Sequence, residues 1–277
     1  MRLGGPVFDR DTDPDEWART VRQLGYRAAY APVNDDATDD MVTGYARAAQ
    51  TANIVIAEVG AWSNPLSPDN QTRREAIVFC QKRLAFADRI GARCCVNITG
   101  SRGEQWDGPH PDNLTAATFD LIVDTVREII DAVKPRRTFY TLETMPWAYP
   151  DSPDSYLALL KAIDRPQCAA HLDPVNLVNS PQRFYHTAPL LQECFDKLGP
   201  YIKSCHAKDI ALSGQLTTHL NEVRVGLGGL DYRVFLQELN KLDADTPLML
   251  EHLPTAQDYN LAASHIRTVA SELGMQL

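Results

Sequence analysis

Short apolar runs alternate with longer amphipathic stretches along this chain of 277 residues. The short runs have the length and apolar content of buried strands, whereas the longer stretches repeat apolar residues at helical spacing. We expect strands at 3–8, 27–33, 53–59, 92–99, 137–143, 167–173, 201–206 and 247–251. We expect helices at 13–24, 39–52, 69–90, 114–133, 152–163, 231–242 and 256–273, and one at 181–198 that is interrupted near Pro189.

This order gives eight strand–helix alternations, each of about 30–35 residues as in βαβ units. The even alternation indicates a parallel sheet, and eight units favour closure into a single (β/α)8 TIM barrel in one domain, 1–277. A doubly wound open sheet is the alternative, although no glycine-rich dinucleotide fingerprint follows any expected strand. The longest loops follow the third, fourth, fifth and seventh strands, while the turns entering strands are short. This asymmetry favours a barrel with its site at the carboxyl ends of the strands.

Four of the later strands end in a carboxylate or an imidazole, at Glu143, Asp173, His206 and Glu251. In a barrel these strands are neighbours, so the four side chains would surround one small volume. Three carboxylates that close together each resist ionisation, and a divalent cation removes the conflict. We therefore predict a divalent metal site, with Mn²⁺ as first choice and Mg²⁺ or Co²⁺ as alternatives. Four separate strand ends, each satisfied by a loop amide, form the competing interpretation.

Composition narrows the function further. The net charge of −9 and the pI of about 5.2 argue against a nucleic-acid partner, which calls for a basic face. The first residues lack the apolar segment of a signal peptide, and no run reaches transmembrane length. The six cysteines form no C-x-x-C pair and most lie in apolar runs, so we expect reduced thiols in a cytoplasmic protein.

Several short motifs carry a family resemblance. They are Leu142-Glu143, Leu172-Asp173, His206-Ala207-Lys208-Asp209, Arg224 to Gly226 with Gly228 to Asp231, and Leu250-Glu251. With the strand pattern over nearly the whole chain, they make it similar to the xylose-isomerase-like sugar isomerases and epimerases. That family includes the ketose 3-epimerases, hydroxypyruvate isomerase and inosose dehydratase, and more distantly endonuclease IV.

The resemblance implies an enzyme in which Glu143, Asp173, His206 and Glu251 bind the metal. It further implies that Glu143 and Glu251 act as acid and base on opposite faces of a small carbohydrate or keto-sugar. One would remove a proton next to the carbonyl to give a cis-enediolate held on the metal, and the other would return a proton. Returning it to the opposite face gives an epimerase, and to the adjacent carbon an isomerase. A lyase or dehydratase, which eliminates from the same intermediate, is the runner-up.

The resemblance also indicates candidate substrate contacts. Arg224 matches the family arginine that touches substrate oxygens, and Asn176 stands where the ketose epimerases carry a histidine. This departure, and Trp147 in a loop where those enzymes have a further glutamate, makes an ordinary ketohexose epimerase a poor fit. Lys208 is expected to reach a substrate oxygen or to pair with Asp209.

Further candidates come from the loops and strand faces. Three indoles on the long loops are expected to line the pocket or to anchor the loops, namely Trp62, Trp106 and Trp147. His171 shares a strand face with Asp173 and is either a substrate contact or a buried structural residue. His252 should point outward by strand alternation. The glycines around Gly226 suit a turn better than a phosphate cradle.

Two other function classes remain open. A DNA-repair nuclease of the endonuclease IV kind would need more metal ligands and a basic groove. A non-catalytic metal-binding or assembly subunit would use the loop aromatics at an interface. We expect a small-molecule carbohydrate partner, no nucleic acid and no membrane, with a homo-oligomer as a further possibility.

Overall fold

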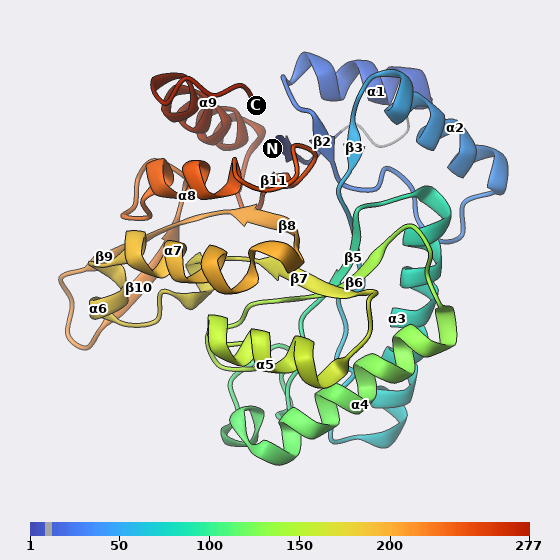
Figure 1. The fold of residues 1–277 in the computed structure, drawn as a ribbon, viewed down its shortest axis with the longest axis vertical. Coiled ribbons are helices and arrows are strands. Elements are labelled where there is room, and N and C mark those ends of the chain that lie inside the picture. The colour runs from blue at the N-terminus through green and yellow to red at the C-terminus, as the bar shows by residue number, and fades with distance from the viewer. Residues whose placement is uncertain (9–12) are drawn as a thin grey trace.

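Strands and helices alternate along the chain in the computed structural model, which describes residues 1–8 and 13–277. The strands are β1 (Arg2–Gly5), β2 (Ala28–Ala29), β3 (Val55–Ile56), β4 (Glu58–Gly60), β5 (Cys94–Asn97), β6 (Phe139–Glu143), β7 (Cys168–Leu172), β8 (Ile202–Ala207), β9 (Asp209–Ser213), β10 (His219–Val223) and β11 (Pro247–Leu250). The α-helices are α1 (Pro14–Gln23), α2 (Asp39–Thr51), α3 (Asn70–Ile90), α4 (Ala116–Val133), α5 (Pro153–Ile163), α6 (Pro181–Phe184), α7 (Thr187–Leu198), α8 (Tyr232–Leu239) and α9 (Ala256–Glu272). The helices lie around the outside of the strands (Figure 1).

The main sheet is parallel and closes into a barrel. Its strand order is β3-β2-β1-β11-β8-β7-β6-β5-β4, so both ends of the order belong to one stretch of chain. Only Ala57 separates β3 from β4, and its N–H donates to the carbonyl of Ala29 while its own carbonyl accepts from Cys94. Hydrogen bonding therefore continues across this point. The predicted TIM barrel is confirmed, with the third expected strand divided at Ala57.

Local sequence signals set the helix ends. The side chain of Asp13 accepts hydrogen bonds from the backbone N–H groups of Asp15 and Glu16, which caps α1. Gly91 ends α3 with a φ of 78°, a conformation that glycine adopts without strain. The short turn that follows leads directly into β5, so the long loops stay at the carboxyl ends of the strands, where the expected site lies.

Two expectations about the region 181–229 were wrong. The break in the helix at 181–198 falls at Tyr185 and His186, and not at Pro189. Pro189 lies in the first turn of α7, where its missing N–H would have no helical partner in any case. The stretch after the seventh expected strand, taken as a loop, contains an antiparallel hairpin of β9 and β10. This hairpin extends from the edge of the barrel (Figure 1).

The core fills the barrel and the space between sheet and helices. All six cysteines are buried thiols within it, and burial raises the pKa of the Cys168 and Cys194 thiols to about 12. Among the described residues, the helices include none with the length and apolar content needed to span a bilayer.

Candidate metal centre

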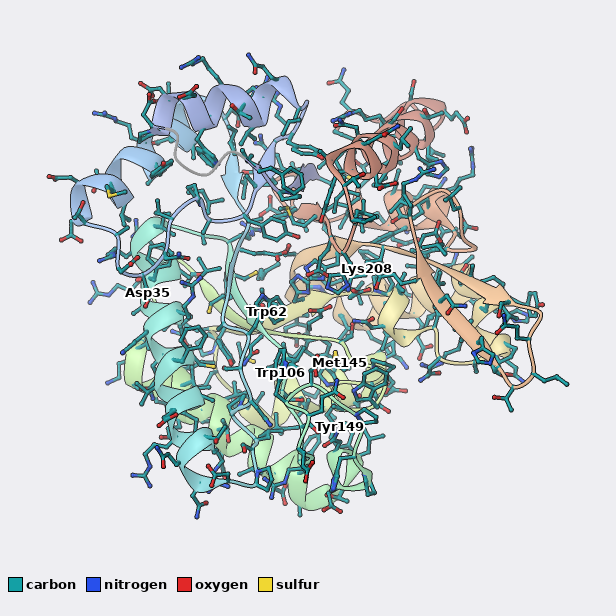
Figure 2. All side chains as sticks on the ribbon, turned by 180° about the vertical axis from the view of Figure 1, so that it is seen from behind. Asp35, Trp62, Trp106, Met145, Tyr149 and Lys208 are labelled. Atoms are coloured by element: carbon teal, nitrogen blue, oxygen red, sulfur yellow. The ribbon has the colours of Figure 1, made fainter. Side chains whose placement is uncertain are left out.

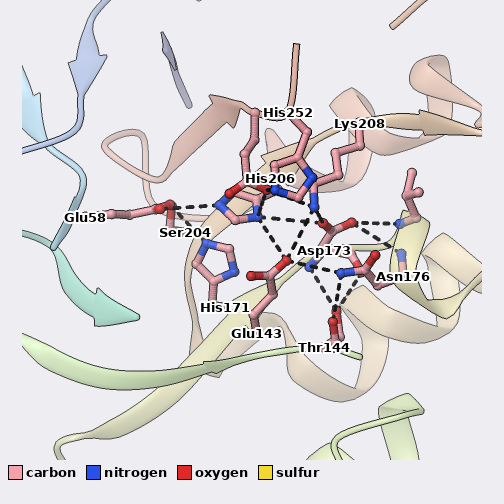
Figure 3. A network of polar contacts seen from close by, with 12 residues as sticks. Glu58, Glu143, Thr144, His171, Asp173, Asn176, Ser204, His206, Lys208 and His252 are labelled. Carbon is pink, nitrogen blue, oxygen red and sulfur yellow. Dashed lines mark hydrogen bonds and ion pairs between the residues drawn. The ribbon is translucent and has the colours of Figure 1, made fainter. Parts of the chain in front are cut away.

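The carboxyl ends of β6, β7, β8 and β11 bring together the four predicted ligands (Figure 3). These strands are consecutive neighbours in the sheet. The ligand atoms of Glu143, Asp173, His206 and Glu251 all lie within 4.8 Å of one another. Nδ1 of His206 is at the centre of the group, 3.2 Å from Oε1 of Glu143, 3.1 Å from Oε2 of Glu251 and 3.6 Å from Oδ2 of Asp173.

Lys208, two residues after His206, extends its ammonium group into the same cluster. Its Nζ lies 2.8 Å from Oδ2 of Asp173, 2.8 Å from Oε2 of Glu251 and 3.6 Å from Oε1 of Glu143. The side chain is buried, and its charge offsets part of the repulsion among three carboxylates. Lys208 therefore belongs to the centre itself and does not pair with Asp209.

The electrostatic environment keeps Asp173, Glu251 and His206 ionised. Burial by itself would raise the pKa of Asp173, but the charges of Lys208 and His206 hold that pKa well below its usual range. The pKa of Glu251 is also lowered, against the effect of burial, by His206 and Lys208. Burial opposes the charge on His206, but the carboxylates of Glu251, Glu143 and Glu58 raise its pKa well above the usual value.

The donor set fits a divalent metal ion. Oδ1 of Asp173 accepts a hydrogen bond of 3.0 Å from the N–H of Val175, which directs Oδ2 into the cluster. Among the described residues, Oδ2 of Asp173 and Oε2 of Glu251 accept no hydrogen bond, although both are in ion-pair contact with Lys208. Three carboxylates and one imidazole therefore point at one small volume, and some of their lone pairs accept no hydrogen bond. Such a set of ligands suits Mn²⁺, Mg²⁺ or Co²⁺.

A second buried network lies behind His206, and the sequence did not reveal its role. Glu58, at the start of β4, accepts from Nε2 of His171 at 3.0 Å and from the hydroxyl of Ser204. Its other oxygen lies 3.4 Å from Nε2 of His206. The two imidazole rings meet edge to face, with centroids 4.2 Å apart. Glu58 therefore lies beside Nε2 of His206, on the opposite side of the ring from the carboxylates near Nδ1 (Figure 3).

A pocket of about 370 Å³ opens above the centre. Glu143 and Glu251 line it, and so does Lys208. Asp173 and His206 are wholly buried below it and are not part of its lining. The pocket walls also carry the three loop indoles that the sequence singled out, which are Trp62, Trp106 and Trp147.

The family model described as "Xylose isomerase-like TIM barrel" matches residues 18–269. The chain belongs to this family. No curated protein sequence matches it significantly.

Solved structures extend the likeness over nearly the full chain. D-psicose 3-epimerase from Clostridium cellulolyticum is 13% identical, with a TM-score of 0.67 over 97% of this chain and 99% of that one. A probable 3-DHS dehydratase from Bacillus anthracis is 15% identical, with a TM-score of 0.68 over 98% and 99%. Endonuclease IV from Thermus thermophilus is 12% identical, with a TM-score of 0.74 over 98% and 100%. At such identities the likeness establishes the fold, and the reaction must be argued from the site.

Of the two expected substrate contacts Asn176 and Arg224, the first lines the pocket and the second does not. Asn176 lines the pocket, and its amide donates hydrogen bonds of 3.1 Å to Oε1 of Glu143 and to the carbonyl of Thr144. It therefore positions Glu143. Arg224 is absent from the pocket lining, and its Nε lies 3.8 Å from Oδ1 of Asp258.

His171 is the buried structural residue that was one of its two expected roles, whereas His252 lies elsewhere than expected. His171 has no exposed surface, and its Nε2 is engaged by Glu58. His252, expected to point outward, lines the pocket with its Nδ1 3.2 Å from Oε2 of Glu222. That expectation was wrong because β11 ends at Leu250 and His252 has a φ of 56°, so strand alternation no longer applies.

The Gly-rich motif is explained by Asp209. Its carboxylate accepts hydrogen bonds from the N–H groups of Gly226, Gly228 and Leu230. A Cβ atom on Gly228 would lie 2.3 Å from Oδ1 of Asp209, so the motif needs glycine at this position. These amides hold the loop against the end of β8 and are occupied, which supports the turn and not the phosphate cradle.

Proposed function

We propose that this chain is a divalent-metal-dependent isomerase or epimerase of a small carbohydrate or keto-sugar. One observation carries the proposal. Of the four candidate ligands, the two glutamates also line the pocket, whereas Asp173 and His206 are buried beneath it. A carboxylate that faces both the metal position and the substrate can exchange a proton with the substrate, and two such groups form an acid–base pair.

The four ligands would hold Mn²⁺, with Mg²⁺ or Co²⁺ as alternatives. Bound there, the ion would polarise the substrate carbonyl and so make the neighbouring C–H more acidic. The remaining chemistry belongs to side chains of this chain. Lys208 and His206 keep Glu251 ionised, and Asn176 fixes the orientation of Glu143.

The two glutamates come from opposite ends of a row of four strands. Glu143 ends β6 and Glu251 follows β11, with β7 and β8 between them. A substrate seated over this row therefore has one carboxylate on each side. One of them would remove the proton next to the carbonyl. The other would deliver a proton to the opposite face, which inverts the centre, or to the adjacent carbon, which moves the carbonyl.

Solvent isotope exchange tests the proposal. Protein loaded with Mn²⁺ and incubated in D₂O with a panel of ketoses and keto-glycosides should incorporate deuterium next to the carbonyl of its substrate. Glu143→Gln and Glu251→Gln should each lower the exchange rate by at least about 10²-fold, the lower end of a general acid–base contribution. EDTA should abolish exchange and added Mn²⁺ should restore it. Exchange that proceeds equally without metal, or in both variants, would contradict the proposal.

Elimination on the same site is the second candidate, and His252 favours it. This histidine lines the pocket and lies 3.5 Å from Oε2 of Glu251, paired with Glu222 from the hairpin. A protonated imidazole beside a basic carboxylate could donate a proton to a leaving hydroxyl. Product mass separates the two reactions, because isomerisation and epimerisation conserve it and elimination of water lowers it by one water.

A further inference from the structure

The pocket above the metal centre is divided into a charged side and an apolar side. Most of the charged groups come from the ends of β6, β8 and β11 and from the hairpin, with Glu143, Lys208, Glu222 and Glu251 among them, while Asp107 follows Trp106 on the loop after β5. The apolar groups come from the loops after β4, β5 and β6. They are Trp62, Ile98, Trp106, Met145, Pro146 and Trp147. Figure 2 shows Trp62, Trp106 and Met145 in the same part of the molecule, with Lys208 beyond them.

The apolar side is held in place by contacts between its loops. Nε1 of Trp147 donates a 2.8 Å hydrogen bond to the carbonyl of Asp107, and Asn113 donates to the carbonyl of Trp147 at 3.3 Å. The indole of Trp62 lies so close to Gly60 that a Cβ atom there would be 2.4 Å from Nε1. The indoles are nevertheless about 40% exposed, at 41% for Trp62, 40% for Trp106 and 39% for Trp147. They form an ordered surface that is open to a ligand.

This surface suits an apolar group better than a bare sugar. Hydroxyl groups buried against indole, methionine and proline side chains would lose their hydrogen bonds to water without replacement. An apolar or aromatic group in the same place would gain from the area removed from water and from ring stacking. The pocket volume of about 370 Å³ is in the range of pockets that bind small molecules.

Charge in the pocket disfavours an anionic ligand. A divalent ion and Lys208 together would balance Glu143, Asp173 and Glu251, so the centre has no positive charge to spare. The other charged groups in the described lining are Asp107, Glu222 and His252, and His252 is already paired with Glu222. In the glycine-rich loop, the amides of Gly226, Gly228 and Leu230 already donate to Asp209. A phosphate or carboxylate group would therefore meet acidic neighbours.

We propose that the pocket binds an uncharged keto-sugar ring that carries an apolar aglycone, so that simple glycosides serve as unreactive binding probes. The ring lies over the metal centre, and the aglycone lies on Trp62, Trp106 and Trp147. The inference rests on the proposed function for the location of the ring, and it adds the substrate class, a neutral glycoside in place of a free sugar phosphate or sugar acid.

Ligand binding can be followed by intrinsic fluorescence, because three of the four tryptophans line the pocket. Mg²⁺-loaded protein is titrated with phenyl and methyl β-glycosides of D-glucose, D-galactose and D-xylose, and with D-glucose 6-phosphate. We expect a phenyl glycoside to bind at least about tenfold more tightly than its methyl partner, because the phenyl ring covers apolar surface. The phosphate should bind more weakly than the neutral glycosides.

Variants assign the effect to the indole surface. Trp106→Ala should bring the affinities of the phenyl and methyl glycosides close together while leaving the methyl glycoside little changed. Gly60→Ala should reduce the phenyl preference by displacing Trp62. Trp17→Phe is the matched control, since Trp17 is a buried residue of α1 that meets Tyr45 edge to face and is not part of the pocket lining. It should keep both the preference and the fluorescence change.

Three results would overturn the inference: equal affinities for phenyl and methyl glycosides, tighter binding of the phosphate, or no saturable binding by any glycoside. Binding is measured without turnover, so the two proposals fail separately. A protein that prefers phenyl glycosides but never exchanges solvent deuterium keeps the substrate class and loses the proton-transfer function. A protein that exchanges deuterium into free sugar phosphates keeps the proton-transfer function and loses the proposed substrate class.

Discussion

Replacing Glu58 by glutamine should weaken metal binding although Glu58 is not itself one of the four candidate ligands. A histidine that ligates through Nδ1 must carry its remaining proton on Nε2. A carboxylate facing Nε2 enforces that arrangement because it can only accept. In this chain Oε2 of Glu58 lies 3.4 Å from Nε2 of His206, while Nδ1 faces the carboxylates. A glutamine side chain has nearly the same shape but can turn its NH₂ group toward Nε2, which favours the wrong tautomer.

The magnitude follows from the geometry. Loss of such a partner typically costs about 10–100-fold in metal affinity. The 3.4 Å contact is longer than a strong N–H···O hydrogen bond, so the lower part of the range applies. We expect Glu58→Gln to raise the Kd for Mn²⁺ by about 10–30-fold, or about 1.4–2 kcal/mol. Isothermal titration calorimetry on metal-stripped protein measures it, with Co²⁺ absorption as an independent report on the ligand set.

Ser204→Ala provides the matched control. It removes the hydroxyl that also donates to Glu58 but leaves the contact between Glu58 and His206 in place. Its Kd for Mn²⁺ should stay within about threefold of the native value, because Ser204 contacts Glu58 and not the candidate ligand His206. If Glu58→Gln folds normally and binds Mn²⁺ as tightly as the native protein, Glu58 does not orient His206 and the reasoning is refuted.

Two further predictions concern the stability of the centre. Saturating Mn²⁺ at about 100 times its Kd should stabilise the fold by about 2.7 kcal/mol, and EDTA should reverse the gain. For a chain of this size that corresponds to a rise in Tm of roughly 5–10 °C by differential scanning fluorimetry, and an unchanged Tm would argue against a metal site. Lys208→Met should destabilise the metal-free protein by about 3 kcal/mol in urea unfolding, the lower end of the cost of breaking a buried ion pair, because His206 remains beside Asp173 and Glu251. The loss should be smaller with metal bound, and equal losses in both forms would show that Lys208 and the ion do not share these carboxylates.

The barrel and the four-ligand cluster were predictable because both depend on regular patterns. Strand–helix alternation sets the order of the strands, and parallel neighbours bring their carboxyl ends together. Local signals such as Asp13 before α1 and Gly91 after α3 fix the helix ends without reference to the rest of the fold. Residues at strand ends, such as Glu143 and Asp173, could therefore be placed from the sequence.

Contacts across the barrel interior could not be placed in this way. Glu58 meets His171 and Ser204 over separations of 113 and 146 residues. Which inward-facing side chains touch depends on strand register and tilt, and the short sequence of β4 specifies neither. One signal was present: a glutamate in a run of buried apolar residues needs a partner. The partner's identity required the three-dimensional structure.

Irregular backbone accounts for the remaining errors. His252 turns into the pocket because the chain leaves the extended conformation directly after β11. The hairpin of β9 and β10 supplies Glu222 to the pocket from a stretch whose glycines suggested a loop. Both residues lie near the mouth of the site, where the regular barrel pattern ends. The sequence therefore predicts the four-residue cluster at the strand ends better than the side chains at the mouth of the pocket.

This difference bears on how one fold supports an epimerase, a dehydratase and a nuclease. The barrel fixes the strand ends, and the chemistry of the pocket mouth comes from the loops. A nuclease must accept a phosphate backbone, whereas the mouth of this pocket carries Asp107 and Glu222 and the chain has a net charge of −9. Among the described lining residues, the indole side carries no cationic side chain to balance a phosphate group. Loop composition at the mouth thus supports the proposed neutral ligand over a nucleic acid, although the overall fold is shared with both kinds of enzyme.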